Sequence, residues 1–219
     1  MRMNGFRRRL AGGWLIGVMA LGGAGCATGA APRSVAGGDA VVAEAPTFKV
    51  GEEWRWEGAS YPMYLRVVEV LDSGSVVEAN VDLWCWQGCR YIRDRKGMAT
   101  SAVNDKGEPV YVMGLNQLDF PLKVGKEWTQ RLDLRQLSDG AVRPFDNRWK
   151  VEAFEVVTVK AGTFKAFRIT WRQDNRGGQQ TWSGTWSLWW SPEVKTYVKQ
   201  VFHTTGSSQD WELASFVLK

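Results

Sequence analysis

Histidine and cysteine are scarce in this chain of 219 residues, which holds one His and three Cys. A Ser-His-Asp or Cys-His centre would therefore depend on His203 alone. A metal site built from these residue types needs several ligands, and His203 is far in sequence from the cysteines. The usual motifs for phosphate binding, serine esterases and zinc proteases are also missing. We therefore predict no catalytic residue, no metal site and no cofactor, and we interpret His203 as a strand residue without a catalytic role.

Excess positive charge is confined to the N-terminus. The formal charge of +5 includes Arg2, Arg7, Arg8 and Arg9. A chain that begins at Cys26 keeps 24 Lys and Arg against 23 Asp and Glu, which is a net charge of +1. Domains that bind nucleic acids usually present a basic surface, so this balance argues against a nucleic-acid partner.

The first 25 residues have the three parts of a secretory signal peptide. Arginines extend to Arg9, an apolar run spans 10–21, and small residues fill 22–25. The apolar run is shorter than the roughly 20 residues of a membrane-spanning helix. Residues 26–46 are rich in Ala, Gly and Pro and are expected to form a flexible tether.

Ala24, Gly25 and Cys26 resemble the end of a bacterial lipoprotein signal, although Gly23 stands where such signals prefer Leu or Val. The resemblance implies that residues 1–25 are removed and that Cys26 carries acyl chains, which anchor the protein to a membrane. Ala27 in place of Asp favours the outer membrane, with the domain facing the periplasm. The alternative is a secreted protein that is cut nearby and carries no lipid.

Residues 47–219 show the patterns of antiparallel β structure and no convincing helical period. The regular spacing predicts an all-β domain, a curved antiparallel sheet in the form of a half-barrel, a barrel or a sandwich. "VLDSGS" resembles one loop of an aspartic protease, but the second loop is missing and Asp-Ser-Gly suits a hairpin turn. The expected strands are Met63–Leu71, Val76–Trp84, Arg148–Val159, Phe164–Gln173, Thr181–Trp190, Lys195–His203 and Trp211–Leu218.

One short sequence occurs twice. "KVGEEW" (49–54) recurs as "KVGKEW" (123–128). The echo predicts a two-arm internal repeat, with arms 47–120 and 121–219. The alternative is a chance match of a glycine turn that starts a strand.

Tryptophan is abundant, with 13 residues. Successive strand residues point to opposite faces, so Trp182, Trp186 and Trp190 share one face and small hydroxyl residues share the other. Trp171 takes the same place on the preceding strand, and the two strands are expected to form a hairpin with its aromatic face inward. These four indoles either line a site for an apolar or sugar ligand or fill the core of the sheet.

The two remaining cysteines stand four residues apart in "CWQGC". In an oxidising compartment this spacing predicts a local disulfide between Cys85 and Cys89. Free thiols or a metal site are the alternatives.

The C-terminal half carries two further elements. "VVTVKAGTFKAFRITW" (156–171) and "WWSPEVKTYVKQ" (189–200) resemble a group of mostly uncharacterised bacterial envelope lipoproteins with the pattern V-T-V-x-A-G-T-F … W-x-x-P-x-V. Lys160 replaces the usual Pro, and Glu193 and Lys195 replace usual glycines. The resemblance implies a curved antiparallel sheet, similar to the half-barrel of lipoprotein carriers, and assigns no catalytic residue. The residues that carry it are Val157, Thr158, Val159, Ala161, Gly162, Thr163, Phe164, Trp189, Ser191, Pro192, Val194 and Lys199.

Together these features predict a lipid-anchored envelope protein without enzymatic activity. It is expected to bind an apolar small molecule, a lipid or an envelope partner through its Trp-rich face. Two alternatives stay open: an envelope hydrolase that acts on glycan or lipid, and a purely structural or interaction lipoprotein. The sequence does not address the oligomeric state.

Overall fold

The computed structural model describes residues 40–58, 62–79, 89–94, 99–103, 109–112, 117–136, 140, 142–177, 182–204 and 210–219. The chain divides into two units, Met1–Gly38 and Asp39–Lys219, and every described residue belongs to the second unit. The predicted signal peptide, Cys26 and Cys85 lie outside the described residues. Cys89 is described in its backbone only, so the disulfide stays a prediction.

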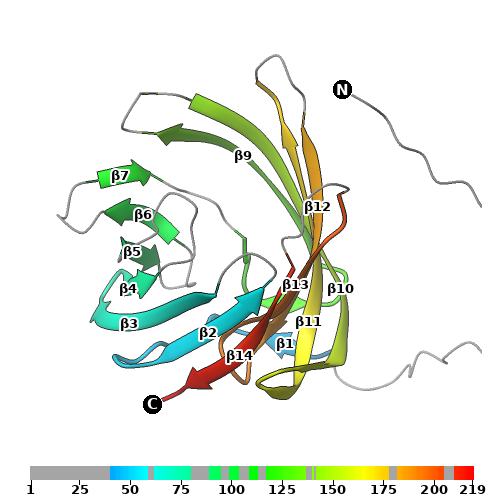
Figure 1. Ribbon diagram of the computed structural model, residues 1–219. Helices are drawn as coiled ribbons and strands as arrows, with labels where there is room; N and C mark the ends of the chain where they lie inside the picture. Colours follow the sequence, from blue (N-terminus) through cyan, green and yellow to red (C-terminus); the bar gives the residue numbers. More distant parts are fainter. Residues whose placement is uncertain are drawn as a thin grey trace, which may run out of the picture. The chain divides into compact units, whose positions relative to one another are not determined.

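The described residues form strands and contain no helix, which confirms the predicted all-β class (Figure 1). Accordingly, this part of the chain has no helix of the length and hydropathy needed to cross a membrane. The strands are β1 (Val42–Ala43), β2 (Glu53–Gly58), β3 (Met63–Leu71), β4 (Gly74–Ala79), β5 (Cys89–Asp94), β6 (Ala99–Val103), β7 (Pro109–Val112), β8 (Leu122–Lys123), β9 (Glu127–Gln136), β10 (Val142–Val159), β11 (Gly162–Asn175), β12 (Ser183–Ser191), β13 (Thr196–Phe202) and β14 (Trp211–Val217).

One curved antiparallel sheet contains every strand except β1 and β8, which pair with each other. Its neighbours follow the order β10-β11-β12-β13-β14-β2-β3-β4-β5-β6-β7-β9, and β9 pairs again with β10. The β7–β9 link consists of two residue pairs. Bulges, for example between Val151 and Ala153, bend the strands and help the sheet to curve. The architecture is therefore a single bent sheet and not the two packed sheets of a sandwich.

The expected strands correspond to β3, β4 and β10–β14, which are seven of the fourteen described strands. β3 has the predicted bounds, and the "DSGS" segment forms the turn into β4. β10 begins at Val142, six residues before the expected Arg148. The reason is Pro144, which lacks an N–H and argues against a strand in the sequence, yet here pairs in register with Asp133 of β9.

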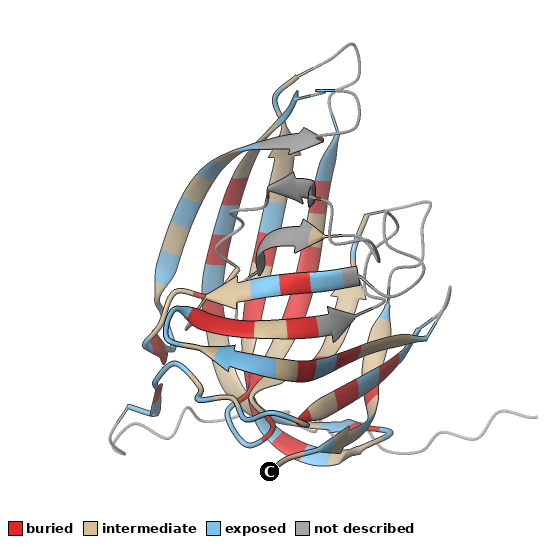
Figure 2. Ribbon diagram, turned by 90° about the vertical axis from the view of Figure 1, so that its left-hand side faces the viewer, coloured by how far each residue is buried: buried red, intermediate tan, exposed pale blue. Residues whose placement is uncertain are grey.

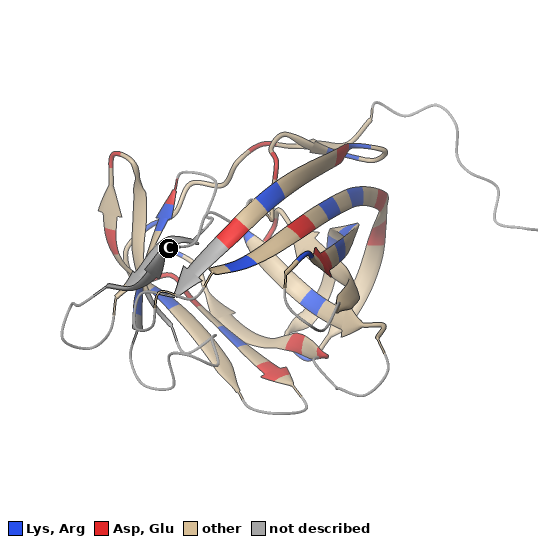
Figure 3. Ribbon diagram, turned by 90° about the horizontal axis from the view of Figure 1, so that it is seen from above, with Lys and Arg blue, Asp and Glu red and all other residues tan. Residues whose placement is uncertain are grey.

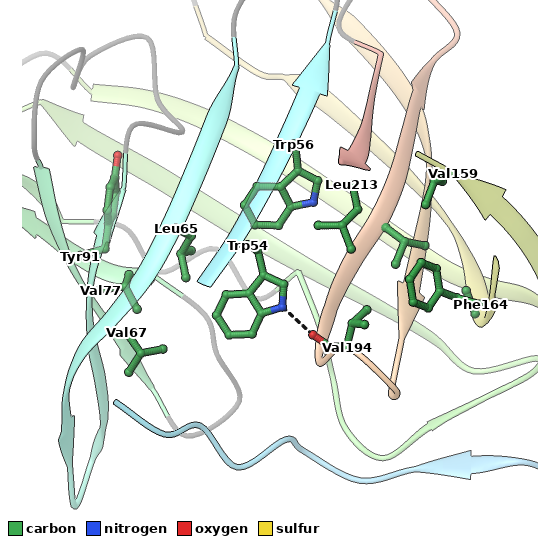
Figure 4. Close-up of a cluster of buried hydrophobic side chains, with 12 residues drawn as sticks. Trp54, Trp56, Leu65, Val67, Val77, Tyr91, Val159, Phe164, Val194 and Leu213 are labelled. Atoms are coloured by element: carbon green, nitrogen blue, oxygen red, sulfur yellow. Dashed lines mark hydrogen bonds between the residues drawn. The ribbon is translucent and has the colours of Figure 1, made fainter. Parts of the chain in front are cut away.

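The buried side chains form two clusters. Figure 2 marks the buried positions along the strands in red. The first joins β2–β5 to β13, β14 and the β10–β11 turn, and it centres on Trp54, whose Nε1 donates to the carbonyl of Val194 at 2.7 Å (Figure 4). The second cluster covers β10, β11 and β12 with aromatic rings and includes Leu118, from the segment before β8, and Leu122 of β8.

The N-terminal end of the described domain takes part in this packing. Val42–Ala43 falls within the range expected as tether, but the structure places it in β1, paired with Leu122–Lys123. Ala43 lies opposite Leu122 in this pair and is buried in the second cluster. The fold therefore begins before Pro46, the expected end of the tether.

The two copies of the repeated sequence adopt the same turn. Gly51 and Gly125 have φ values of 87° and 85°, a region that favours glycine. Each glycine N–H donates to a valine carbonyl on a later strand, Val67 at 2.8 Å and Val151 at 2.8 Å. The shared geometry agrees with the repeat hypothesis for arms 47–120 and 121–219, which stays a prediction.

Candidate functional site: rows of aromatic and amide side chains on the sheet

Five aromatic rings lie side by side across five neighbouring strands and form what we call the aromatic row. The members are directly opposite one another in the strand register. The ring centroids of Trp171 and Trp186 are 4.2 Å apart, and the rings are inclined by 20°. Ring contacts of this kind between paired strands stabilise a sheet. The aromatic row consists of Trp128 on β9, Trp149 on β10, Trp171 on β11, Trp186 on β12 and Phe202 on β13.

The structure brings the four predicted indoles onto one face of the β11–β12 hairpin. Trp171 pairs with Trp186, and Phe167 pairs with Trp190, a register that places these rings on the face predicted by the alternating pattern. Trp171, Trp186 and Trp190 are buried in the second cluster, and Trp190 contacts Phe120 of the segment before β8. The surroundings of these three indoles match the interpretation that they fill the core of the sheet. Trp182 differs, because 38% of it is exposed.

A row of amide side chains runs beside the aromatic row on the same face, and we call it the amide row. Asn147 of β10 lies opposite Gln130 of β9 and Gln173 of β11. Gln173 in turn lies opposite Gly184 of β12. The three amide residues and Gly184 each stand two residues along their strand from a member of the aromatic row. They therefore lie on the same face of the sheet as that row.

Asn147 is the buried centre of the amide row, with an exposed fraction of 1%. Its Oδ1 accepts hydrogen bonds from Trp171 Nε1 at 3.0 Å and Gln173 Nε2 at 2.9 Å. These two donors fix the orientation of the amide. Its Nδ2 has no acceptor among the described residues, and neither has Nε1 of the neighbouring Trp149.

The next row outward carries Leu132, Phe145, Asn175 and Trp182. Asn175 N–H donates to the Trp182 carbonyl at 2.8 Å, which aligns the last two. All four are partly or fully exposed, whereas the aromatic row is mostly buried. Burial therefore decreases from the aromatic row, through the amide row, to this outer row.

Glycine at position 184 makes room for the exposed indole. A Cβ at this position would lie 2.4 Å from a ring atom of Trp186 and 2.7 Å from a ring atom of Trp182. Both rings therefore fold over Gly184, and their centroids are 5.7 Å apart. The exposed indole therefore packs against a buried one.

Charged side chains alternate with the rows along the same strands and therefore point to the opposite face. Figure 3 shows positions of both signs interspersed along the strands. Arg131 pairs with Asp146 at 3.3 Å, and Arg172 pairs with Asp174 at 3.1 Å. Hydrogen bonds from Arg172 and Ser183 hold the pKa of Asp174 below its usual value. The amide row and the outer row contain no Asp, Glu, Lys or Arg.

His203 also lies on the charged face. Its Nε2 is 2.8 Å from Ser187 Oγ, and its N–H donates to the Thr185 carbonyl. Among the described residues no carboxylate bonds to its other ring nitrogen, so the pair lacks the acid of a catalytic triad. No group of three or more His, Cys, Asp or Glu suited to a metal occurs in the described part of the chain.

A second polar feature lies apart from these rows. Burial lowers the pKa of Arg93 on β5 to about 10, and Tyr197 on β13 is one of the groups that act against this shift. Burial also raises the pKa of Tyr197, whose hydroxyl donates to the Gln117 carbonyl at 3.3 Å. The alternating pattern of the sequence could not predict that Arg93 and Tyr197 interact, because their strands are not neighbours in the sheet.

Comparisons with known proteins give structural neighbours and no family. No family model matches the chain, and no curated protein matches it. A "putative lipoprotein" from Parabacteroides distasonis has a TM-score of 0.48 at 14% identity, over 81% of this chain and 100% of the other. A "putative exported protein with YmcC-like fold" from Bacteroides fragilis has 0.41 at 14%, over 80% and 99%. The "hypothetical lipoprotein YmcC" of Escherichia coli has 0.42 at 6%, over 76% and 86%. At these values nothing about activity follows from the likeness.

Proposed function

We propose that this chain is a lipid-anchored protein of the bacterial cell envelope that binds a small ligand with an apolar surface and performs no chemistry on it. The ligand site is the outer end of the aromatic face, at Trp182 and the amide row. One observation carries the binding proposal: a row of stacked indoles that is buried along most of its length ends beside an exposed indole that packs on a buried one.

Support for the anchor comes from the sequence. The charged start, the short apolar run and the small residues before Cys26 form a lipoprotein signal. Two or more acyl chains on Cys26 would bury enough CH₂ groups for stable attachment. Ala27 after the cysteine supports the outer membrane, with the domain in the periplasm.

The anchor is tested by growing cells with an alkynyl palmitate and labelling the purified chain. We expect the native chain to carry the label and Cys26→Ser to carry none. Cys85→Ser is the matched control and should be labelled normally. Equal labelling of the native and Cys26→Ser chains would contradict the anchor.

Support for binding comes from the different surroundings of the four predicted indoles. Trp171, Trp186 and Trp190 are covered by other side chains and serve packing. Trp182 exposes a large apolar ring beside polar groups, which is the usual make-up of a small-molecule site. A ring needed only for the core would be covered as the other three are.

The binding site is tested with N-phenyl-1-naphthylamine, an apolar probe that fluoresces when it leaves water. We expect saturable binding to the purified protein and at least tenfold weaker binding to Trp182→Ala. Val70→Ala, which removes an exposed apolar side chain from β3, is the matched control. Equal binding by the native protein and Trp182→Ala would place the probe elsewhere, and no binding at all would refute an apolar ligand site.

A further inference from the structure

We propose that the ligand of this face is an uncharged saccharide, held by the amide row and by the indole of Trp182. The inference rests on the proposed binding function and names the class of ligand. Three features carry it: amide groups oriented by hydrogen bonds, an exposed ring packed on a buried one, and the lack of charged residues in the amide row and the outer row.

The amide row offers both donors and acceptors in fixed positions. Gln173 uses Nε2 to donate to Asn147, and its Oε1 has no donor among the described residues. Asn147 Nδ2 lacks an acceptor among these residues while it is buried, which costs free energy unless a partner fills the place. Asn147 is therefore a positioning residue: it aims Gln173 and holds a ligand oxygen, or a water beneath the ligand, at Nδ2.

The exposed indole supplies the apolar half of the site. Gly184 lets the ring of Trp182 lie close to Trp186, so little side-chain entropy is lost when a ligand packs on it. The C–H groups on one side of a pyranose ring form a flat apolar surface that packs on an aromatic face, while its hydroxyls point to the sides. This geometry matches an indole with amides next to it.

The charge pattern argues against the main alternative, a phospholipid. An anionic head group needs Lys or Arg, and the amide row and the outer row have neither. An acyl chain alone would cover the amides without satisfying them, which is unfavourable. Hydroxyl and acetamido groups can both donate and accept, as the amides require.

The experiment is a calorimetric titration of the purified protein with N,N′,N″-triacetylchitotriose, and with maltotriose, which has hydroxyls only. We expect saturable binding of at least one of the two. Gln173→Leu and Trp182→Ala should each raise its Kd at least tenfold. Val70→Ala should leave the Kd unchanged. Indole N–H resonances of labelled protein should shift at Trp182 during the same titration.

The outcomes separate this inference from the function on which it rests. If the naphthylamine probe binds at Trp182 and neither saccharide binds, the saccharide class is wrong while the apolar site stands. If a saccharide binds equally to native protein, Gln173→Leu and Trp182→Ala, the assigned place is wrong. If neither the probe nor a saccharide binds, both proposals fail. The test uses Gln173 and not Asn147 because Gln173 is only half-buried, so Gln173→Leu is expected to fold. A change at the buried Asn147 would disturb the core itself.

Discussion

The two turns at 49–54 and 123–128 have nearly the same sequence and the same backbone, yet they hold opposite charges. Glu52 in the first turn is replaced by Lys126 in the second. Glu52 is completely buried and pairs with Lys195 Nζ at 2.7 Å. Lys126 pairs with Asp119 at 2.9 Å, and a third of the Asp119 side chain is exposed. The local sequence sets the turn, and the segment that supplies the ion-pair partner determines which charge the turn can hold.

The strands after the two turns also differ. In the first arm, Trp54 meets the ring of Phe48 edge-on, packs within the first cluster and donates to the Val194 carbonyl. In the second arm, Trp128 and Trp149 stack with ring centroids 5.7 Å apart and begin the aromatic row. The same glycine turn therefore leads into a core of mixed aliphatic and aromatic side chains in one arm and into the candidate binding face in the other.

The largest difference between the two turns should appear when the lysine of each ion pair loses its charge. Lys195→Met leaves the carboxylate of Glu52 buried without a cation and should lower the free energy of unfolding by about 3 kcal/mol or more. Lys126→Met leaves Asp119 partly in water and should cost about 1 kcal/mol or less. Urea denaturation measures both. Equal losses would show that burial of the partner does not distinguish the two turns.

A second comparison concerns the two buried indoles. Trp54→Phe and Trp149→Phe remove the same atoms, but only Trp54 Nε1 bonds to a described residue, the Val194 carbonyl. Losing that bond leaves a buried carbonyl without its indole donor, so Trp54→Phe should be more destabilising by about 1 to 2 kcal/mol. The measurement is the urea midpoint of each variant. A larger loss for Trp149→Phe would mean that its stacking outweighs the bond of Trp54.

The sequence predicted the class of fold and the aromatic face because both depend on alternation within a strand. It could not predict the amide row. Asn147 lies before the expected start of its strand, since Pro144 hides that part of β10. Gln130 and Gln173 gave no signal of their own, and only the register of β9, β10 and β11 brings them together.

The buried ion pair was equally hidden. Glu52 and Lys195 stand 143 residues apart, and no local pattern marks either as buried. The sequence also left two interpretations for the four indoles, because alternation shows which side chains share a face and not what covers that face. The segment before β8 covers part of it, and this segment has no periodic signal.

The smallest difference between the arms should appear when the glycine of each turn is replaced by alanine. Ala at position 51 or 125 must adopt a φ near +85°, which costs a residue with a Cβ about 1 kcal/mol. Neither site is crowded: a Cβ added at Gly125 would have no neighbouring atom within 4 Å, and one at Gly51 would meet only Lys219 Cε at 3.5 Å. Gly51→Ala and Gly125→Ala should therefore lower stability by the same amount in urea denaturation. Unequal losses would mean that the two turns are held differently by their arms, in spite of their common hydrogen bonds.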